Sequence, residues 1–417
     1  MTDATSMLAF QGATTQPFQP PNQIRTRGRE TTRLPAIEGG TALAANRVVS
    51  IDALRGFSFI GILGGDGIAW SLGEMSDGKS GILSDAGIFV RDQFSHVAWE
   101  GFSFYDLIFP LFVFVTGVSI VFSLTHLVER EGKGAAYRRV LRRSFLLFAL
   151  GLLYYGGMSR HWPDIRLLGV LQRIAICYLF ASFLFLSFRW RGLVSAFVLL
   201  VGGYWALMTF VPVPDVGAGS YAMDANLANW IDFNYLPGMK WDVTRDPEGL
   251  LSTLPAIGSC LLGVLAGLLL QDRRVAPRQK SLWLVGAGML MVVVGYLWGL
   301  QFPIIKQIWT SSFVLVAGGW SAVLLGVFHQ LIDVWGWRKW STVLVWIGSN
   351  AIVLYMLGNV MNYYETFATR FVGGDVADFL DRYMTPGTGH LFAAAGGLAT
   401  AITVASYLYR HKIFVRI

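Results

Sequence analysis

Cysteine and charge are both scarce in this chain of 417 residues. It has two cysteines, Cys177 and Cys260, and both lie inside apolar runs, so no disulfide framework is expected and both thiols should pack in the interior. No Cys/His cluster suggests a metal site, and no P-loop or GxGxxG feeding a strand is present. Charged residues make up 14%, against roughly 25% in soluble domains, which argues against an ordinary soluble protein.

Apolar residues are abundant instead. They make up 54% of the chain, and the mean hydropathy is +0.51. A helix needs about 20 apolar residues to cross a bilayer. About ten runs meet that length, near 50–72, 104–127, 141–158, 167–188, 192–211, 253–270, 281–300, 309–332, 341–362 and 390–410. The sequence therefore predicts an all-α, polytopic membrane helix bundle of about ten transmembrane helices.

The first 46 residues have a different composition. They are rich in Thr, Gln, Pro and Arg, and they contain no apolar stretch long enough for a signal peptide. We expect a disordered arm over 1–46 and one membrane domain over 47–417. No internal repeat is visible.

Basic residues alternate along the predicted loops. Lys and Arg concentrate on the cytoplasmic side of membrane proteins. With the N-terminus inside and ten spans, only nine of the 33 basic residues fall in outer segments, and the alternation never breaks. We therefore expect cytoplasmic termini, outer loops at 73–103 and 212–252, and an inner-membrane location among membrane lipids. The net charge of +7 then reflects topology, and no nucleic-acid partner is expected.

Two charges lie at the inner end of the first run. Asp52 and Arg55 are three residues apart and share a helix face, so they can neutralise each other. A structural ion pair is one interpretation, and binding of an anionic donor substrate is the other.

Polar side chains from separate segments fall near the outer third of the membrane. Ionisable groups at such depths usually face a partner or a wet cavity. The group consists of Asp66, His96, Asp106, Arg173, Lys306 and Trp309. His96 has Trp99 and Glu100 close by and precedes an apolar helix, so a titratable imidazole lies at the mouth of that helix. Asn350 enters its span from the inside and could cap or line a cavity.

Several segments together resemble a known family. They are SIDALRG at 50–56, HVAWEGFSFYDLIFPLFVFVTG at 96–117, GVLQRIAICY at 169–178, DPEGLLSTLPAI at 246–257, FPIIKQIWTSSFVL at 302–315, GSNAIVLY at 348–355 and LYRHKIF at 408–414. Their order and content resemble the transmembrane acetyltransferase family of heparan-alpha-glucosaminide N-acetyltransferase and its bacterial relatives.

The resemblance implies transfer of acetyl from cytosolic acetyl-CoA, across the membrane, to an amino sugar or glycan. The family's essential histidine falls on His96, its following aspartate on Asp106, its GVLQR arginine on Arg173 and its lysine on Lys306. Asp66 and Glu100 depart from the asparagines of the sugar-transferring members, and these departures leave the acceptor open.

An imidazole near neutral pH can act as a base or carry an acyl group. Asp66, Glu100 or Asp106 could orient the ring. The expected site residues are His96, Asp66 and Asp106 for catalysis; Trp99, Glu100, Arg173, Lys306, Trp309 and Asn350 for substrate binding; and Asp52 and Arg55 for acetyl-CoA. No metal cofactor is expected, and a homodimer is left open. The alternative function is a permease or flippase for a sugar or lipid headgroup, without covalent chemistry.

Overall fold

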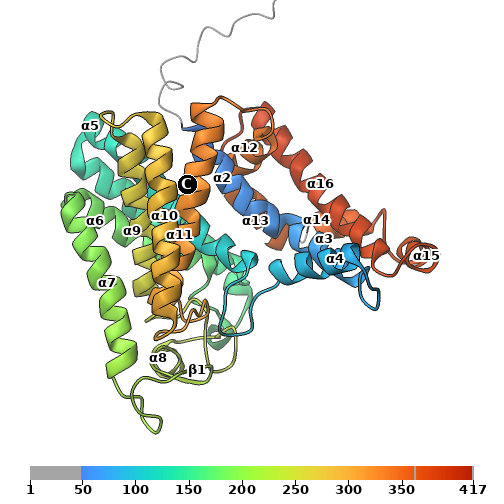
Figure 1. Cartoon of the computed structure of the whole chain (residues 1–417), viewed down its shortest axis with the longest axis horizontal. Helices are drawn as coiled ribbons and strands as arrows, with labels where there is room; N and C mark the ends of the chain where they lie inside the picture. The colour runs from blue at the N-terminus through green and yellow to red at the C-terminus, as the bar shows by residue number, and fades with distance from the viewer. Residues whose placement is uncertain (1–47, 361–362, 416–417) are drawn as a thin grey trace, which may run out of the picture. The chain divides into compact units, whose positions relative to one another are not determined.

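The computed structural model describes residues 48–360 and 363–415. The arm predicted over 1–46 lies outside these residues. The membrane domain is all-α, as expected, apart from one small hairpin (Figure 1).

The elements follow one another in this order: α2 (Val49–Ile60), η1 (Gly61–Gly65), α3 (Asp66–Glu74), α4 (Ile82–Gln93), α5 (Phe104–Tyr154), η2 (Gly157–Ser159), η3 (Trp162–Asp164), α6 (Val170–Ser187), α7 (Trp190–Phe210), β1 (Tyr221–Ala222), β2 (Ala225–Asn226), α8 (Leu227–Tyr235), α9 (Thr253–Gln271), α10 (Pro277–Gly299), α11 (Ser311–Phe328), η4 (His329–Val334), α12 (Thr342–Ser349), α13 (Ala351–Val360), α14 (Tyr363–Thr369), α15 (Asp375–Tyr383) and α16 (Thr388–Arg410).

Within the described residues, seven helices are long and apolar enough to cross a membrane. They are α5, α6, α7, α9, α10, α11 with η4, and α16. The chain is thus a multi-pass membrane protein. The count of ten spans and the orientation of the termini stay predictions.

Four of the ten apolar runs differ from a simple span. The runs 104–127 and 141–158 lie in one 51-residue helix, α5, which breaks at Gly132 because this residue has φ 83°. The first run is interrupted at Gly64, where φ is 132°. The run 341–362 divides into α12 and α13 at Asn350. The interruptions at Gly64 and Asn350 leave pieces of helix too short to count singly as spans.

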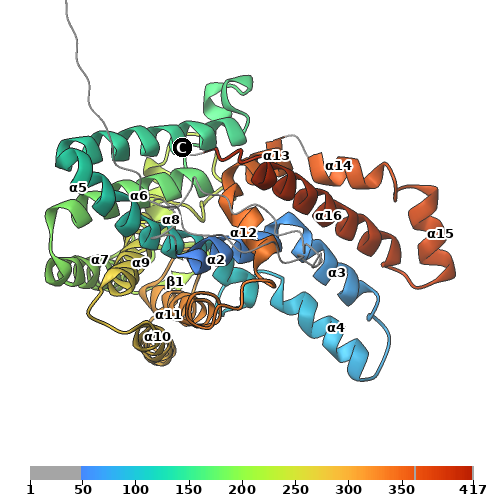
Figure 2. The same ribbon diagram turned by 90° about the horizontal axis from the view of Figure 1, so that it is seen from above.

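The core forms where helices α5, α6, α9 and α11 pack together, while α16 lies beside α3 and α14 and α15 pack on α16 (Figures 1 and 2). Gly263 and Gly267 of α9 have the small-residue spacing that permits close helix packing. A Cβ at Gly263 would meet the Phe114 carbonyl oxygen of α5 at 1.9 Å, so only glycine permits this approach of α9 to α5.

Asp52 and Arg55 form the expected ion pair at 3.1 Å. Arg55 also donates to the Gly348 carbonyl at 3.3 Å and to Ser119 Oγ at 2.7 Å. These bonds connect α2 to α12 and α5, which favours the structural interpretation of the pair.

Candidate active site

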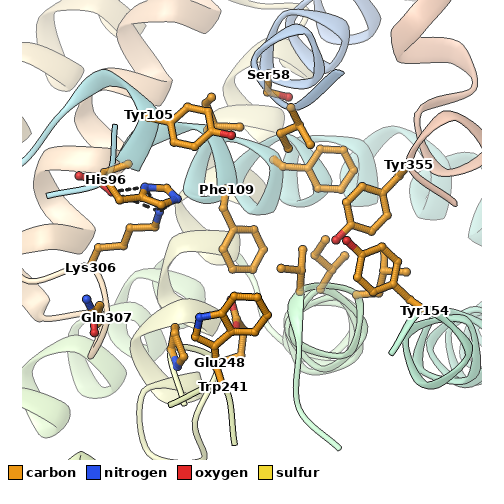
Figure 3. Close-up of a pocket in the computed structure, with 18 of the residues that line it drawn as sticks. Ser58, His96, Tyr105, Phe109, Tyr154, Trp241, Glu248, Lys306, Gln307 and Tyr355 are labelled. Carbon is orange, nitrogen blue, oxygen red and sulfur yellow. Dashed lines mark hydrogen bonds and ion pairs between the residues drawn. The ribbon is translucent and has the colours of Figure 1, made fainter. Parts of the chain in front are cut away.

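A cavity of about 520 Å³ lies inside the membrane domain. Its walls come from α2, α5, α6 and α13 and from the loops that precede α5, α6, α9 and α11. Figure 3 shows His96 and Lys306 at one side of this space, with Tyr154 and Tyr355 at the other and Phe109 between them. We call it the His96 cavity. Four loops that the sequence places on the outer side thus meet around one space.

Three side chains form a compact triangle at this wall. His96 Nδ1 lies 2.8 Å from Asp106 Oδ1, and Lys306 Nζ lies 3.2 Å from the same oxygen. Lys306 Nζ is also 2.9 Å from Nδ1 and 3.3 Å from Nε2 of the ring. The sequence predicted that these three residues fall at one level, and the structure brings them into contact.

Asp106 is held rigidly by the start of α5. Ser103 caps the helix, and its backbone N–H donates to Asp106 Oδ2 at 3.2 Å in a capping box. Val97 N–H donates to the same oxygen at 3.4 Å. The carboxylate is 1% exposed, and its second oxygen is left for His96 and Lys306. The local helix start therefore fixes the group that orients the imidazole.

Lys306 reaches His96 through a short pairing of loops. Glu100 and Ile305 form an antiparallel bridge, and Gly101 N–H donates to the Ile304 carbonyl at 2.9 Å. The turn after Lys306 closes at Trp309, whose φ of 51° is rare for a non-glycine residue. Such strain persists only where the surroundings enforce it. The strained turn holds Lys306 beside a residue 210 positions earlier.

The ring orientation follows from its acid neighbour. A carboxylate accepts only, so Nδ1 must donate to Asp106 and Nε2 carries the lone pair in the neutral imidazole. Burial lowers the pKa of the Lys306 ammonium, and the adjacent Asp106 carboxylate opposes that shift. The imidazole itself is accessible, with 54% of the side chain exposed.

Asp66 does not contact the His96 imidazole directly as expected, because Tyr105 lies between the two side chains. Its Oδ2 accepts a hydrogen bond from the Tyr105 hydroxyl at 2.8 Å, and the Tyr105 ring packs against His96 with centroids 4.6 Å apart. Asp66 also lines a second cavity of about 810 Å³ between α3 and α16. Asp106, and not Asp66, therefore orients the imidazole, and Asp66 acts on the site through Tyr105.

A second cluster on the cavity wall was missed by sequence reasoning. Arg166, 2% exposed, donates from Nε to Asp246 Oδ2 at 2.9 Å and from Nη2 to Glu248 Oε2 at 2.6 Å. Its guanidinium lies over the rings of Tyr155 and Trp241, at 4.7 and 5.0 Å. The two closely spaced carboxylates of the DPEG segment were the available signal, but their partner lies 80 residues earlier.

Burial also shapes the ionisation of this cluster. It raises the pKa of the Glu248 carboxyl, and the Arg166 and Arg173 guanidinium groups work against that rise. Burial alone would lower the pKa of Arg166, but Asp246 and Glu248 raise it above the usual value. Arg166 therefore stays charged and is fully engaged by the two carboxylates.

Comparison with known proteins decides the family. A sequence profile of the heparan-alpha-glucosaminide N-acetyltransferase catalytic domain matches residues 47–295, more than half of the chain. This chain belongs to the heparan-alpha-glucosaminide N-acetyltransferase catalytic family.

Two curated relatives carry the name of that family. The heparan-alpha-glucosaminide N-acetyltransferase of Homo sapiens is 26% identical over 388 residues, and that of Mus musculus is 27% identical over 384 residues. Each alignment covers 78% of this chain and 56% of the relative. The chain thus spans about half the length of the curated relatives it matches. The family profile includes His96, Asp106, Arg166 and Glu248, whereas Lys306 lies beyond its last matched residue.

Arg173, Trp309 and Asn350, predicted to bind substrate in this family member, are not among the residues that line the His96 cavity. Arg173 is 1% exposed and donates to the Gly249 carbonyl at 3.2 Å and to Ser252 Oγ. Trp309 packs beneath it and donates from Nε1 to Ser259 Oγ at 3.0 Å. Asn350 accepts from Val415 N–H at 3.3 Å. All three thus contact neighbouring segments of the chain, and their role in substrate binding stays a prediction.

Trp99 and Glu100 shape the loop around His96. Trp99 Nε1 donates to the Tyr221 carbonyl at 2.9 Å, which connects this loop to the hairpin of β1 and β2. Glu100 is exposed at the bridge to Ile305. Neither is among the residues that line the His96 cavity. Within residues 48–360 and 363–415, no group of three or more His, Cys, Asp or Glu side chains is arranged to hold a metal ion.

Proposed function

We propose that this chain is a membrane-embedded acetyltransferase. It moves an acetyl group from acetyl-CoA, which binds from the cytoplasm, to an amino sugar or glycan on the other side of the inner membrane. The proposal includes a catalytic domain over 47–417, ten spans and cytoplasmic termini. The observation that carries it is the His96 imidazole, held by Asp106 beside Lys306 on the wall of a cavity of about 520 Å³.

The shape of the His96 cavity supports a donor arm that reaches His96 through the bundle. Part of its wall is apolar and comes from Phe59 and Ile62 of the first run, Phe112 of α5 and Ile174 of α6. A pantetheine arm is uncharged and flexible, so it suits such a channel, whereas CoA phosphates would stay with basic residues of the inner loops. The Asp52–Arg55 pair is engaged in bonds between helices, and the inner-loop basic residues are better donors for the phosphates.

The chemistry follows from the lone pair that the neutral ring carries on His96 Nε2. In direct transfer, Nε2 takes a proton from the acceptor amine or hydroxyl as that atom attacks the thioester carbonyl. The C–S bond then breaks, and the thiolate leaves with the proton from the imidazolium. Asp106 stabilises the imidazolium. In the covalent route, Nε2 attacks the carbonyl first, the C–S bond breaks and CoA leaves as the thiolate. The acceptor then attacks the acetyl carbon, the bond to Nε2 breaks to restore the neutral ring, and the acceptor's proton passes to the thiolate.

Lys306 has a separate task in either route. Its ammonium lies 3.3 Å from Nε2, so it is placed to donate to the oxyanion that develops when a carbonyl is attacked beside the ring. Arg173, which the sequence suggested for substrate binding, donates to Gly249 and Ser252 and is not among the residues that line the cavity.

The test is release of free thiol from acetyl-CoA by purified protein when amino sugars are added. His96→Ala should reduce the rate by ~10²–10⁴ and leave acetyl-CoA binding and thermal stability nearly unchanged, since the side chain is half exposed. His161→Ala, at an exposed loop residue, is the matched control. Full activity of His96→Ala would remove the basis of the proposal. Uptake of a labelled sugar without thiol release would favour the permease alternative.

A further inference from the structure

The second cavity, of about 810 Å³, shares a wall with the His96 cavity. Ile62, Tyr105 and Tyr355 line both spaces. Its other walls come mainly from η1, α3, α13, α14 and α16. We call it the Asp66 cavity, after the carboxylate on its wall. Its volume lies in the range of small-molecule sites, about 300–1,000 Å³, and the proposed acetyl transfer assigns it no ligand.

Glycines make room beside the Asp66 carboxylate. Gly64 and Gly67 both line the cavity next to it, and Gly64 has the φ of 132° that breaks the first run. A Cβ at Gly67 would lie 3.1 Å from the Cβ of Ala394, so α3 and α16 approach closely here. The residues around Asp66 in the chain therefore leave its carboxylate open to the cavity.

The charge of Asp66 has no cationic partner in this space. Within residues 48–360 and 363–415, no ion pair joins Asp66 to a Lys or Arg, and neither residue type is among the described side chains that line the cavity. The one histidine on its wall, His390, lies 3.0 Å from Glu74. The His96 cavity, in contrast, is lined by Arg166 and Lys306. A ligand that completes the Asp66 cavity therefore brings positive charge.

Aromatic rings surround the same space. The aromatic residues on its wall are Trp70, Phe94, Tyr105, Tyr355 and Tyr364. Trp70 follows Asp66 by four residues in α3, so the two share a helix face, and 60% of Trp70 is exposed. The rings of Phe94 and Tyr105 have centroids 6.2 Å apart. The face of an aromatic ring attracts an ammonium group within about 6 Å, and such rings are poor partners for a hydrated metal ion.

We propose that the Asp66 cavity binds a free organic cation with a methylated ammonium head, which lies between the Asp66 carboxylate and the aromatic rings. Both carboxylate oxygens already accept a hydrogen bond at 2.8 Å, from the Tyr105 hydroxyl and the Gly67 N–H. A methylated ammonium needs no acceptor, whereas a primary ammonium brings three donors. Because no Lys or Arg lines the space, a phosphate would have no cationic partner, and this excludes a phospholipid headgroup. The inference does not depend on acetyl transfer.

The experiment measures binding of three probes to the full chain by calorimetry in a maltoside detergent, without acetyl-CoA. The probes are choline, 3,3-dimethylbutan-1-ol and phosphocholine. The alcohol has the shape of choline without its charge, and phosphocholine carries the phosphate of a lipid headgroup. Choline should bind at least ~10-fold more tightly than either of the other two, because only choline brings a cation without an added anion.

Two variants locate the site. Asp66→Asn removes the charge and keeps the size of the side chain, so choline affinity should fall ~10-fold while binding of the neutral alcohol stays unchanged. Trp70→Ala should weaken choline binding ~3- to 10-fold. The matched controls are Trp190→Ala, at a tryptophan of α7 that is also 60% exposed, and Glu131→Gln, at an exposed carboxylate of α5; neither should change the affinity.

No binding of choline, equal binding of the neutral alcohol, or unchanged choline affinity in Asp66→Asn would each overturn the site. Equal or tighter binding of phosphocholine would also overturn it, since the ligand would then be a lipid headgroup. If Asp66→Asn does not fold, Trp70→Ala decides, because its largely exposed side chain can be removed without opening the core, and an unchanged affinity there has the same consequence. A chain that binds choline selectively but releases no thiol would keep this site and lose the proposed function.

Discussion

Asp106→Asn is the substitution that separates orientation of His96 from its presence. One Asp106 oxygen accepts from His96 at 2.8 Å and Lys306 at 3.2 Å, and the other accepts from the Ser103 and Val97 amides. An asparagine has one acceptor oxygen, so its NH₂ group must face one of these sets of donors. If the oxygen stays with the backbone, the imidazole and the ammonium lose their acceptor.

The structure sets the size of the effect. Each lost hydrogen bond to a charged group costs about 1.5–3 kcal/mol, and Asp106 is 1% exposed, so water cannot replace the lost partner. We expect Asp106→Asn to lower the rate of thiol release by ~10²–10⁴, because the wrong tautomer of His96 becomes available. Removing Asp106 also further lowers the pKa of Lys306, since the carboxylate is the main group opposing the effect of burial.

The assay is thiol release at saturating acetyl-CoA, with thermal unfolding of each variant measured alongside. Asp85→Asn is the matched control, because Asp85 is exposed at the start of α4 and should leave both values unchanged. The reasoning is refuted if Asp106→Asn folds and works within about threefold of the parent chain, since the imidazole would then need no carboxylate.

Three further predictions follow from the fold around the site. Asp66→Ala and Tyr105→Phe each remove the same 2.8 Å hydrogen bond, so each should slow transfer by less than ~10-fold and the double variant should be no slower than either single one; additive losses would show separate roles. Burial raises the pKa of Asp232 to about 7, so this residue binds a proton more tightly in the folded loop 227–252 than in the unfolded chain. The stability of the loop should therefore fall as the pH rises from the usual pKa of Asp toward about 7. Hydrogen exchange of residues 227–252 should show this pH dependence in the parent chain and lose it in Asp232→Asn. An impermeant thiol reagent should label Ala218→Cys from outside and Ala276→Cys only after permeabilisation, against a low background because both native cysteines are buried; the opposite pattern would reverse the topology.

Much of the fold was predictable, because a membrane helix is visible in the sequence as an apolar run within its own segment. Each apolar run corresponds to helix in the structure, since backbone groups in a bilayer must be satisfied within the segment. The interruptions were harder to predict. Nothing local required α5 to continue from residue 104 to 154 with a break at Gly132, or the last-but-one run to divide at Asn350.

The sequence alone determined that His96 is the central candidate and that Asp106 follows it at the start of a helix, because a cap and its helix are neighbours along the chain. Only the tertiary structure decided which distant groups meet there. Lys306 reaches His96 through loop pairing across 210 residues, and Arg166 meets Asp246 across 80. The same helix packing buries Arg173 and Trp309 in the core. Local sequence patterns identify the residues that carry a charge or an imidazole. The partner of each such residue depends on how the helices pack, and no short segment of a single sequence contains that information.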